Sequence, residues 1–172
     1  FAMNLLGMSN KAHVVADGIE LAPAIRDSWF KVVGWIPQNP ALASGTVRKQ
    51  FNVVDASLKD GDIVALLARC GLLIADLPQG LDSVLASATE GGSAASGGQI
   101  RKIAVARALA AKPRLIVADE PTADLDQESS DQVLSVLRAY AASGAIVICI
   151  SHDLSLLVET DTKSTFVRGP LT

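Results

Sequence analysis

A turn, a helix and a strand follow one another across residues 93–126, and this succession constrains the fold more than any other part of the sequence. The small residues Ala95–Gln99, two of them glycines, precede an apolar pattern of helical period about 13 residues long. A proline ends that pattern, and the apolar run Leu115–Ala118 follows with the character of a buried strand. A helical pattern over Glu128–Tyr140 again leads into an apolar run, Ala145–Ile150. Apolar strands that alternate with helices predict a parallel sheet with helices packed on it.

The glycine-containing turn has the composition of an anion site. Gly97 and Gly98 at the start of a helix leave backbone N–H groups uncovered, and the helix dipole adds partial positive charge there. The hydroxyl of Ser96 lies beside those amides in the sequence and is also suited to cap the helix. Taken alone, such a turn is more often an ordinary loop than a phosphate site.

Two adjacent acids, Asp119 and Glu120, follow the strand Leu115–Ala118. Successive side chains of a strand point in opposite directions, so one acid can hold Mg²⁺ while the other faces an attacking water. A second polar residue, His152, follows the strand Ala145–Ile150. Open α/β sheets bind ligands beyond the carboxyl ends of their strands, which favours a functional role for this histidine.

Five segments in a fixed order resemble the motifs of ATP-binding-cassette (ABC) ATPases. Ala95–Gln99 resembles the signature motif, with Ala95 where the family usually has leucine, and Leu115–Glu120 resembles the Walker B strand with its catalytic glutamate. The other three are Val33–Gln38, similar to the strand that enters the Q-loop, Ala123–Asp126, similar to the D-loop, and Ser151–Asp153, similar to the switch histidine. The resemblance covers nearly the whole chain.

The resemblance implies an α/β fold of the P-loop NTPase-like (ABC ATPase) type, a parallel sheet core with an inserted helical subdomain. Residues 1–41 and 113–172 would form the two parts of the ATPase core, and residues 42–112 the helical subdomain and signature helix. No G-x-x-x-x-G-K-[ST] sequence occurs in the 172 residues, so the Walker A segment is lacking. We therefore interpret the chain as a fragment that starts just after Walker A.

The resemblance also implies roles around ATP and Mg²⁺. Glu120 would orient the attacking water, His152 would contact the γ-phosphate, and Asp119 and Gln38 would act at Mg²⁺, with Gln38 also relaying nucleotide occupancy. The residues implied to bind nucleotide are Gln38, Ser96, Gly97, Gly98, Gln99 and Asp126.

In the family two cassettes sandwich two ATP molecules, so the signature residues would serve the site of a second ABC ATPase domain and Asp126 would lie at the interface. That partner would be an identical or a different chain. The other implied partners are the transmembrane domains of a transporter, which would place the chain at the cytoplasmic face of the cell (inner) membrane.

The sequences of residues 77–82 and of Glu90–Gly92 are similar to those of exporter-type cassettes, including the cysteine/glutathione exporter linked to cytochrome bd assembly. Glu90 would contact coupling helices. The alternative for this loop is a polar, flexible segment without such a role, since residues 86–89 depart from the usual spacing of the family. For the function, two alternatives stay open: a soluble ABC ATPase coupled to nucleic acid, and a fragment with no ATPase activity of its own. The net charge of −3 weighs against the first, and no nucleic-acid partner is expected.

Several local expectations accompany this interpretation. Strand, turn and strand are expected over residues 13–21, with His13 at the surface. From Gly45 to Leu85 the pattern turns helical and polar, and helices are expected over residues 47–54, from about residue 60 through Ala68, and over residues 72–77. The residues expected on the buried face of the signature helix are Ile100, Ile103, Ala104, Ala108 and Ala111. Arg101 lies off that face, and Arg107 is expected to bind nearby carbonyls or acids. Cys70 and Cys149 form no disulfide framework, and Cys149 is expected to be buried.

Overall fold

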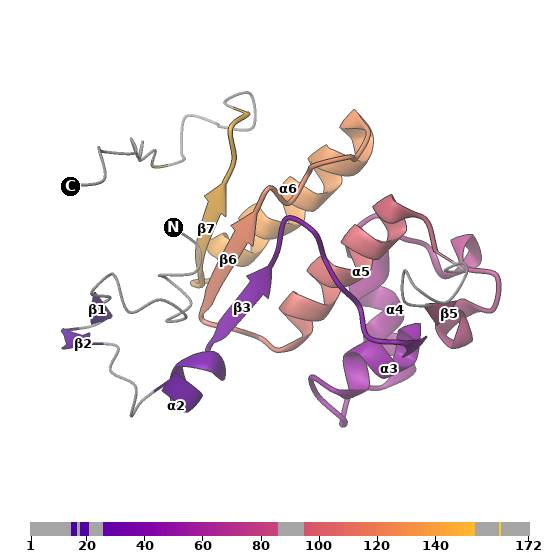
Figure 1. The fold of residues 1–172 in the computed structure, drawn as a ribbon, viewed down its shortest axis with the longest axis horizontal. Helices are drawn as coiled ribbons and strands as arrows, with labels where there is room; N and C mark the ends of the chain where they lie inside the picture. Colours follow the sequence, from indigo (N-terminus) through magenta and orange to yellow (C-terminus); the bar gives the residue numbers. More distant parts are fainter. Residues whose placement is uncertain (1–14, 17, 21–25, 86–94, 154–161, 163–172) are drawn as a thin grey trace, which may run out of the picture.

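The computed structural model describes residues 15–16, 18–20, 26–85, 95–153 and 162 (Figure 1). Several expectations lie outside these residues, among them those for His13, Glu90 and an apolar helical stretch over residues 1–6. In the described part of the chain, no helix is long and apolar enough to cross a lipid bilayer.

A three-stranded parallel sheet forms the centre of the molecule. Its order is β3 (Val33–Ile36), β6 (Leu115–Asp119) and β7 (Ile146–Ile150). The central strand pairs Ala118 with Ile36 on one side and with Cys149 on the other. The three strands therefore point the same way and end at one edge (Figure 1), which confirms the predicted parallel sheet.

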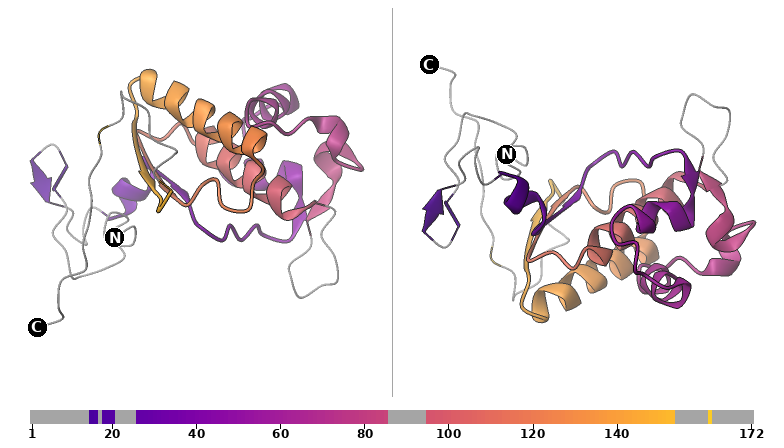
Figure 2. Two further views of the ribbon diagram at one scale, coloured as in Figure 1. Left: turned by 90° about the horizontal axis from the view of Figure 1, so that it is seen from above. Right: turned by 90° about the horizontal axis from the view of Figure 1, so that it is seen from below.

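Two long helices cover the same side of this sheet (Figure 2). Helix α5 (Gly97–Ala110) packs on β3, and α6 (Gln127–Ala142) packs on β7. Ile116 of the central strand and Val133 and Leu137 of α6 belong to one core and are at most 3% exposed. Because two helices seal an aliphatic strand on this side, the burial of its side chains stabilises the fold.

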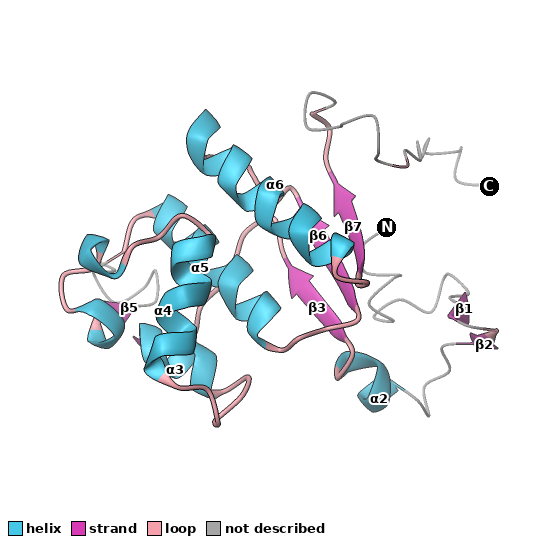
Figure 3. Ribbon diagram, turned by 180° about the vertical axis from the view of Figure 1, so that it is seen from behind, coloured by secondary structure: helices cyan, strands magenta, loops and turns pink. Residues whose placement is uncertain are grey.

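A group of short elements lies beside the β3 edge of the sheet, away from β7 (Figure 3). It contains α3 (Val47–Asn52), α4 (Asp60–Arg69) and the 3₁₀ turns η2 (Ile74–Asp76) and η3 (Gly80–Asp82). Phe51, Ile63 and Leu67 are at most 1% exposed and join the core that also contains α5.

Two short strands in this region were not predicted. β4 (Gly45–Thr46) pairs antiparallel with β5 (Val84–Leu85), and both strands lie outside the three helices that the sequence predicted for this region. Strands of two residues have no periodicity to detect, and their pairing partner lies far along the chain.

The first described elements are a small hairpin and a short helix. β1 (Val15–Ala16) and β2 (Ile19–Glu20) pair antiparallel around Gly18, whose φ of 77° favours a residue without a side chain. Helix α2 (Arg26–Phe30) leads into β3. The predicted strand, turn and strand are thus confirmed for the described residues.

The environment of α5 departs from the expected one-sided burial. Along its length the helix is buried on nearly all sides, since it lies between the sheet and the helical elements 47–82. Arg101 is only 5% exposed, although the pattern places it off the apolar face. Ala111, expected to be buried, is exposed because the helix ends at Ala110. Arg107 makes no hydrogen bond or ion pair within the described part of the chain, so that expectation was wrong.

The two cysteines differ in burial. Cys70 is buried, and this burial raises the pKa of its thiol to about 12. Cys149 is exposed, contrary to the prediction. Cys149 lies near the end of β7, the outer strand of the described sheet, on the same face as its register partner Ala118. This is the face that α6 packs on, so the described part of α6 does not cover the strand as far as Cys149.

Candidate functional site at the sheet edge

The carboxyl ends of the three parallel strands bring together the polar residues that the sequence singled out. Asp119 is the last residue of β6, and its register partner is Ile150 at the end of β7. Glu120 follows β6 directly, and Ser151 and His152 follow β7. Gln38 comes two residues after β3. We call Gln38, Asp119, Glu120, Ser151 and His152 the strand-edge cluster.

The carboxylate of Glu120 is the centre of this cluster. The Ser151 hydroxyl donates to Oε2 at 2.8 Å, and the His152 backbone N–H donates to Oε1 at 2.9 Å. The Nδ1 atom of the His152 ring lies 2.7 Å from the same Oε1. An acid, an imidazole and a hydroxyl are therefore in direct contact, a combination suited to orienting a water and moving its proton.

The backbone of Glu120 is in the left-handed region, with φ at 48°. A side-chain-bearing residue adopts this conformation at a cost of about 1–3 kcal/mol, and such residues gather at functional sites. The Glu120 N–H donates to the Ile150 carbonyl at 2.8 Å. That hydrogen bond, together with those to Ser151 and His152, holds Glu120 in a backbone conformation that residues with a side chain disfavour.

The two charges of the pair stabilise one another. Partial burial of Glu120 opposes its ionisation, but hydrogen bonds from His152 and Ser151 outweigh that effect and lower its pKa. The hydrogen bond to Glu120, followed by the charge of that carboxylate, raises the pKa of His152. The histidine ring is 89% exposed, so it is accessible from solvent.

Asp119 differs from its neighbour because no described residue donates a hydrogen bond to its carboxylate. It is partly buried at the strand end, and Gln38 is exposed at the end of the neighbouring strand. A carboxylate and an amide oxygen are hard donors that suit Mg²⁺, which commonly takes one or two carboxylates and completes its shell with water and phosphate. No group of three or more histidine, cysteine, aspartate or glutamate side chains that could hold a metal ion gathers within the described residues.

The turn Ala95–Gln99, which we call the signature turn, is a capped helix start. Ser96 Oγ accepts from the Gln99 N–H at 3.3 Å, and Gln99 Oε1 accepts from the Ser96 N–H at 2.8 Å. Ser96 therefore caps α5, as its sequence position suggested. A side chain added at Gly97 would meet nothing within 4 Å, so the helix start is open to a ligand there.

Asp126 caps the start of α6. Its carboxylate accepts from the Ser129 N–H at 2.8 Å and from the Ser129 hydroxyl at 3.1 Å, and these bonds lower its pKa. The residue is exposed. Its predicted place at a dimer interface stays a prediction, as do the nucleotide roles of the signature residues.

Sequence reasoning missed one buried residue of this region. Arg101 of α5 donates to the backbone carbonyl of Gln38 at 2.9 Å and to that of Glu120 at 3.1 Å. The available signal was an arginine within a helix segment that is otherwise apolar or small. Its partners come from distant parts of the chain and cannot be read from that pattern.

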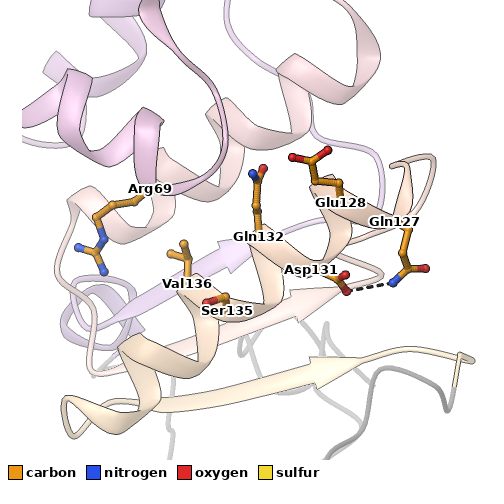
Figure 4. Close-up of a pocket in the computed structure, with 7 residues that line it drawn as sticks. All are labelled: Arg69, Gln127, Glu128, Asp131, Gln132, Ser135 and Val136. Atoms are coloured by element: carbon orange, nitrogen blue, oxygen red, sulfur yellow. Dashed lines mark hydrogen bonds between the residues drawn. The ribbon is translucent and has the colours of Figure 1, made fainter.

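The structure also contains a groove, shown in Figure 4, that is lined by residues outside the strand-edge cluster. It has a volume of about 620 Å³ and is formed by Arg69 of α4 and by one face of α6 from Gln127 to Val136. Gln127 donates to Asp131 at 2.9 Å along that face. None of the predicted site residues lines it. The strand-edge cluster is the better candidate, because it joins an acid, an imidazole and a hydroxyl, which the lining of the groove does not.

Fold and cluster together define an α/β protein of the nucleotide-hydrolysing kind, with its reactive side chains beyond the carboxyl ends of parallel strands. The family model described as ABC transporter matches residues 2–123, well over half of the chain. The chain belongs to the ABC transporter family.

Similar proteins include several exporters. The chain is 33% identical over 161 residues to the ABC multidrug transporter mdr2 of Aspergillus fumigatus, covering 93% of this chain and 20% of that protein. It is 32% identical over 165 residues to an ATM1-type heavy metal exporter of Novosphingobium aromaticivorans, covering 94% and 26%. The glutathione/L-cysteine transport protein CydD of Haemophilus influenzae is 32% identical over 155 residues, covering 90% and 26%.

A solved structure is similar as well. A bacterial Atm1-family ABC exporter with ATP bound matches with a TM-score of 0.81 at 26% sequence identity, covering 93% of this chain and 28% of that chain. The ABC ATPase fold is thereby confirmed. This chain spans only about a fifth to a quarter of the length of the three curated relatives named above.

Proposed function

We propose that this chain is the ATP-binding and hydrolysing cassette of an exporter, and that it powers the movement of a substrate across a membrane. The observation that carries the proposal is the contact of Glu120 with His152 and Ser151 at the end of two neighbouring strands. The exporters among its relatives support the direction of transport. The similarity to the glutathione/L-cysteine transport protein supports, at the level of the subfamily, a small thiol compound as one candidate substrate.

In this proposal the Glu120 carboxylate orients the attacking water and draws on its proton. Its lowered pKa keeps it ionised at neutral pH, as an acceptor must be. His152 contacts the terminal phosphate of ATP and stabilises the charge on the departing phosphoryl group. The ring is exposed and can turn from Glu120 toward a phosphate without unfolding its surroundings.

Asp119 and Gln38 would hold Mg²⁺, which when bound neutralises phosphate charge during phosphoryl transfer. Asp119 has a carboxylate with no other protein partner among the described residues, and Gln38 lies on the exposed loop after β3. The backbone of Gln38 is bonded to α5, so occupancy of this site is relayed toward the helical elements 47–82.

Hydrolysis in this proposal needs a second ABC ATPase domain. The open start of α5, with Ser96, Gly97 and Gly98, would receive the phosphate bound by that partner, and Asp126 would lie at the interface. The transmembrane domains of the transporter are the other partners, with the cassette on the cytoplasmic face of the membrane. The net charge of the chain, −3, gives no general attraction to nucleic acid.

The test uses the full-length protein that carries this sequence, purified in detergent or nanodiscs. Glu120→Gln removes the ionised acceptor but keeps the shape, so we expect kcat for ATP hydrolysis to fall about 100-fold or more, with ATP still bound and the dimer stabilised. Glu128→Gln changes an exposed acid of α6 and serves as the control. ATP hydrolysis at the normal rate by Glu120→Gln would refute the assignment of Glu120.

A further inference from the structure

Arg101 is the most deeply buried charged side chain reported for the described residues, at 5% exposure. Burying a guanidinium is costly unless its N–H groups find acceptors, because water is lost on all sides. The burial lowers the pKa of Arg101, while the charges of Asp124 and Glu120 oppose that effect. The buried guanidinium therefore depends on the acceptors that surround it.

The two ends of the guanidinium reach two different loops. Nη2 donates to the Gln38 carbonyl at 2.9 Å, and Nη1 donates to the Glu120 carbonyl at 3.1 Å. Nη2 also lies 3.7 Å from the Asp124 carboxylate in the turn after β6. Both hydrogen-bonded carbonyls belong to residues of the strand-edge cluster, at the points where β3 and β6 leave the sheet.

Neighbouring residues of the same helix bind the other part of the molecule. Gln99 donates to the Asp76 carbonyl at 3.1 Å, and Lys102 donates to the Gly71 carbonyl at 2.9 Å. Residues three apart lie on one side of a helix, so Gln99 and Lys102 point together toward η2 and the end of α4, and Arg101 points away from Gln99. The first turns of α5 are thus bonded to the helical elements on one side and to the strand-edge cluster on the other.

We propose that Arg101 is a positioning residue, which sets the backbones of Gln38 and Glu120 relative to each other and to the start of the signature helix. This inference rests on the proposed function of the cluster. Any displacement of the signature turn carries Arg101 with it, and Arg101 moves the loop of Gln38 and the backbone of Glu120. A ligand at the start of α5 in this way changes the alignment of the acid that orients water.

Only an arginine can make this link. Its planar fork presents separate N–H groups to two acceptors, whereas the ammonium of lysine is a compact charge on a flexible stem. Arg101→Lys keeps the charge, but its ammonium group can bind only one of the two carbonyl oxygens at a time. Arg101→Met keeps the length of the side chain and loses both bonds. Arg107 is a control on the same helix, half-buried but with no hydrogen bond or ion pair within the described residues.

The experiment compares Arg101→Lys, Arg101→Met and Arg107→Met in the full-length protein, with thermal melts to verify folding. We expect kcat for ATP to fall about 10- to 100-fold in Arg101→Met and less in Arg101→Lys, because small displacements of reacting groups have effects of this size. The KM for ATP should stay within about threefold, since Arg101 touches no nucleotide. Arg107→Met should leave kcat within about twofold.

Hydrogen exchange gives a second measurement that does not depend on turnover. In the nucleotide-free protein, Arg101→Met should speed amide exchange in residues 37–41 and 119–124, and Arg107→Met should not. If the unaltered protein hydrolyses no ATP, the proposed function fails, while hydrogen exchange still decides whether Arg101 joins the two loops. Unchanged exchange in both segments, equal loss of kcat in the Arg101 and Arg107 variants, or a raised KM with an unchanged kcat would each overturn the proposal.

Discussion

The strand-edge cluster and the signature turn are built in opposite ways. The side chains of Glu120, Ser151 and His152 bond to one another across two strands, and a strained backbone at Glu120 holds the centre. Ser96 and Gln99 of the signature turn bond chiefly within their own turn, and its glycines leave backbone N–H groups open. In the proposed function, the strand-edge cluster supplies acid–base chemistry and the signature turn supplies an anion cradle. Because each region would lack what the other supplies, the proposal brings them to one nucleotide by letting two such chains face each other.

The isolated chain is the strongest test of whether these two regions suffice. We expect the purified 172-residue protein to show negligible Mg²⁺-dependent ATP hydrolysis, because its sequence contains no G-x-x-x-x-G-K-[ST] phosphate loop with its lysine. A phosphate-release assay across a range of ATP concentrations measures this. Robust turnover would mean that the cluster and the signature turn alone can clamp the phosphates.

A charge placed in the signature turn should disable that region alone. A side chain at Gly97 meets nothing within 4 Å, so Gly97→Asp should fold and repel phosphate, with ATP hydrolysis in the full-length protein reduced about tenfold or more. Gly97→Ala, with the same space and no charge, is the control and should retain most activity.

Co-purified copies then show which site the turn serves, if the parent protein is a homodimer. A dimer of one Gly97→Asp chain and one Glu120→Gln chain contains one intact combination when the turn acts on the partner's nucleotide. Recovered hydrolysis in that mixed dimer is the expected result. A mixed dimer as inactive as its parents would place the turn and Glu120 at the same chain's nucleotide.

The contact between Glu120 and His152 should make a pH-dependent contribution to stability. The raised pKa of His152 gives a contribution that is complete below about 6.5 and is lost as pH rises through the higher folded value. The lowered pKa of Glu120 gives one that is present above about 4.5 and is lost as pH falls through the lower folded value. The difference in Tm between the unaltered protein and His152→Asn should therefore be largest between about pH 4.5 and 6.5. A difference that does not change from pH 5 to pH 9 would contradict the pairing.

The smallest effect is expected at the cap of α6. Asp126→Ala removes the acceptor for the Ser129 N–H and should lower the free energy of unfolding slightly, whereas Asp126→Asn retains a capping side chain and should lower it less. Denaturant unfolding monitored by circular dichroism measures both. A loss of several kcal/mol in Asp126→Asn would show that the charge has a larger structural role than capping.

Much of the fold could be predicted because it depends on local patterns. The helices α5 and α6, the strands β6 and β7 and the parallel arrangement follow from apolar periodicity and from the break at Pro113. The β4–β5 pair was missed because two-residue strands carry no period. The burial of Cys149 was predicted wrongly because an apolar run shows that a strand is suited to burial but not which elements cover it.

For the site, residue types and their order along the chain were enough to select Asp119, Glu120 and His152, since adjacent acids and a histidine after apolar strands can be recognised without coordinates. Gln38 was selected only by its resemblance to the glutamine of the Q-loop. The hydrogen bonds between the site residues could not be predicted, because contacts across strands depend on the strand register and on the left-handed backbone at Glu120. Arg101 shows most clearly the difference between what the sequence determines and what the tertiary structure determines. Its charge is visible in the sequence, but its role depends on carbonyl oxygens contributed by residues 63 and 19 positions away, which only the packing of α5 against the sheet brings within reach.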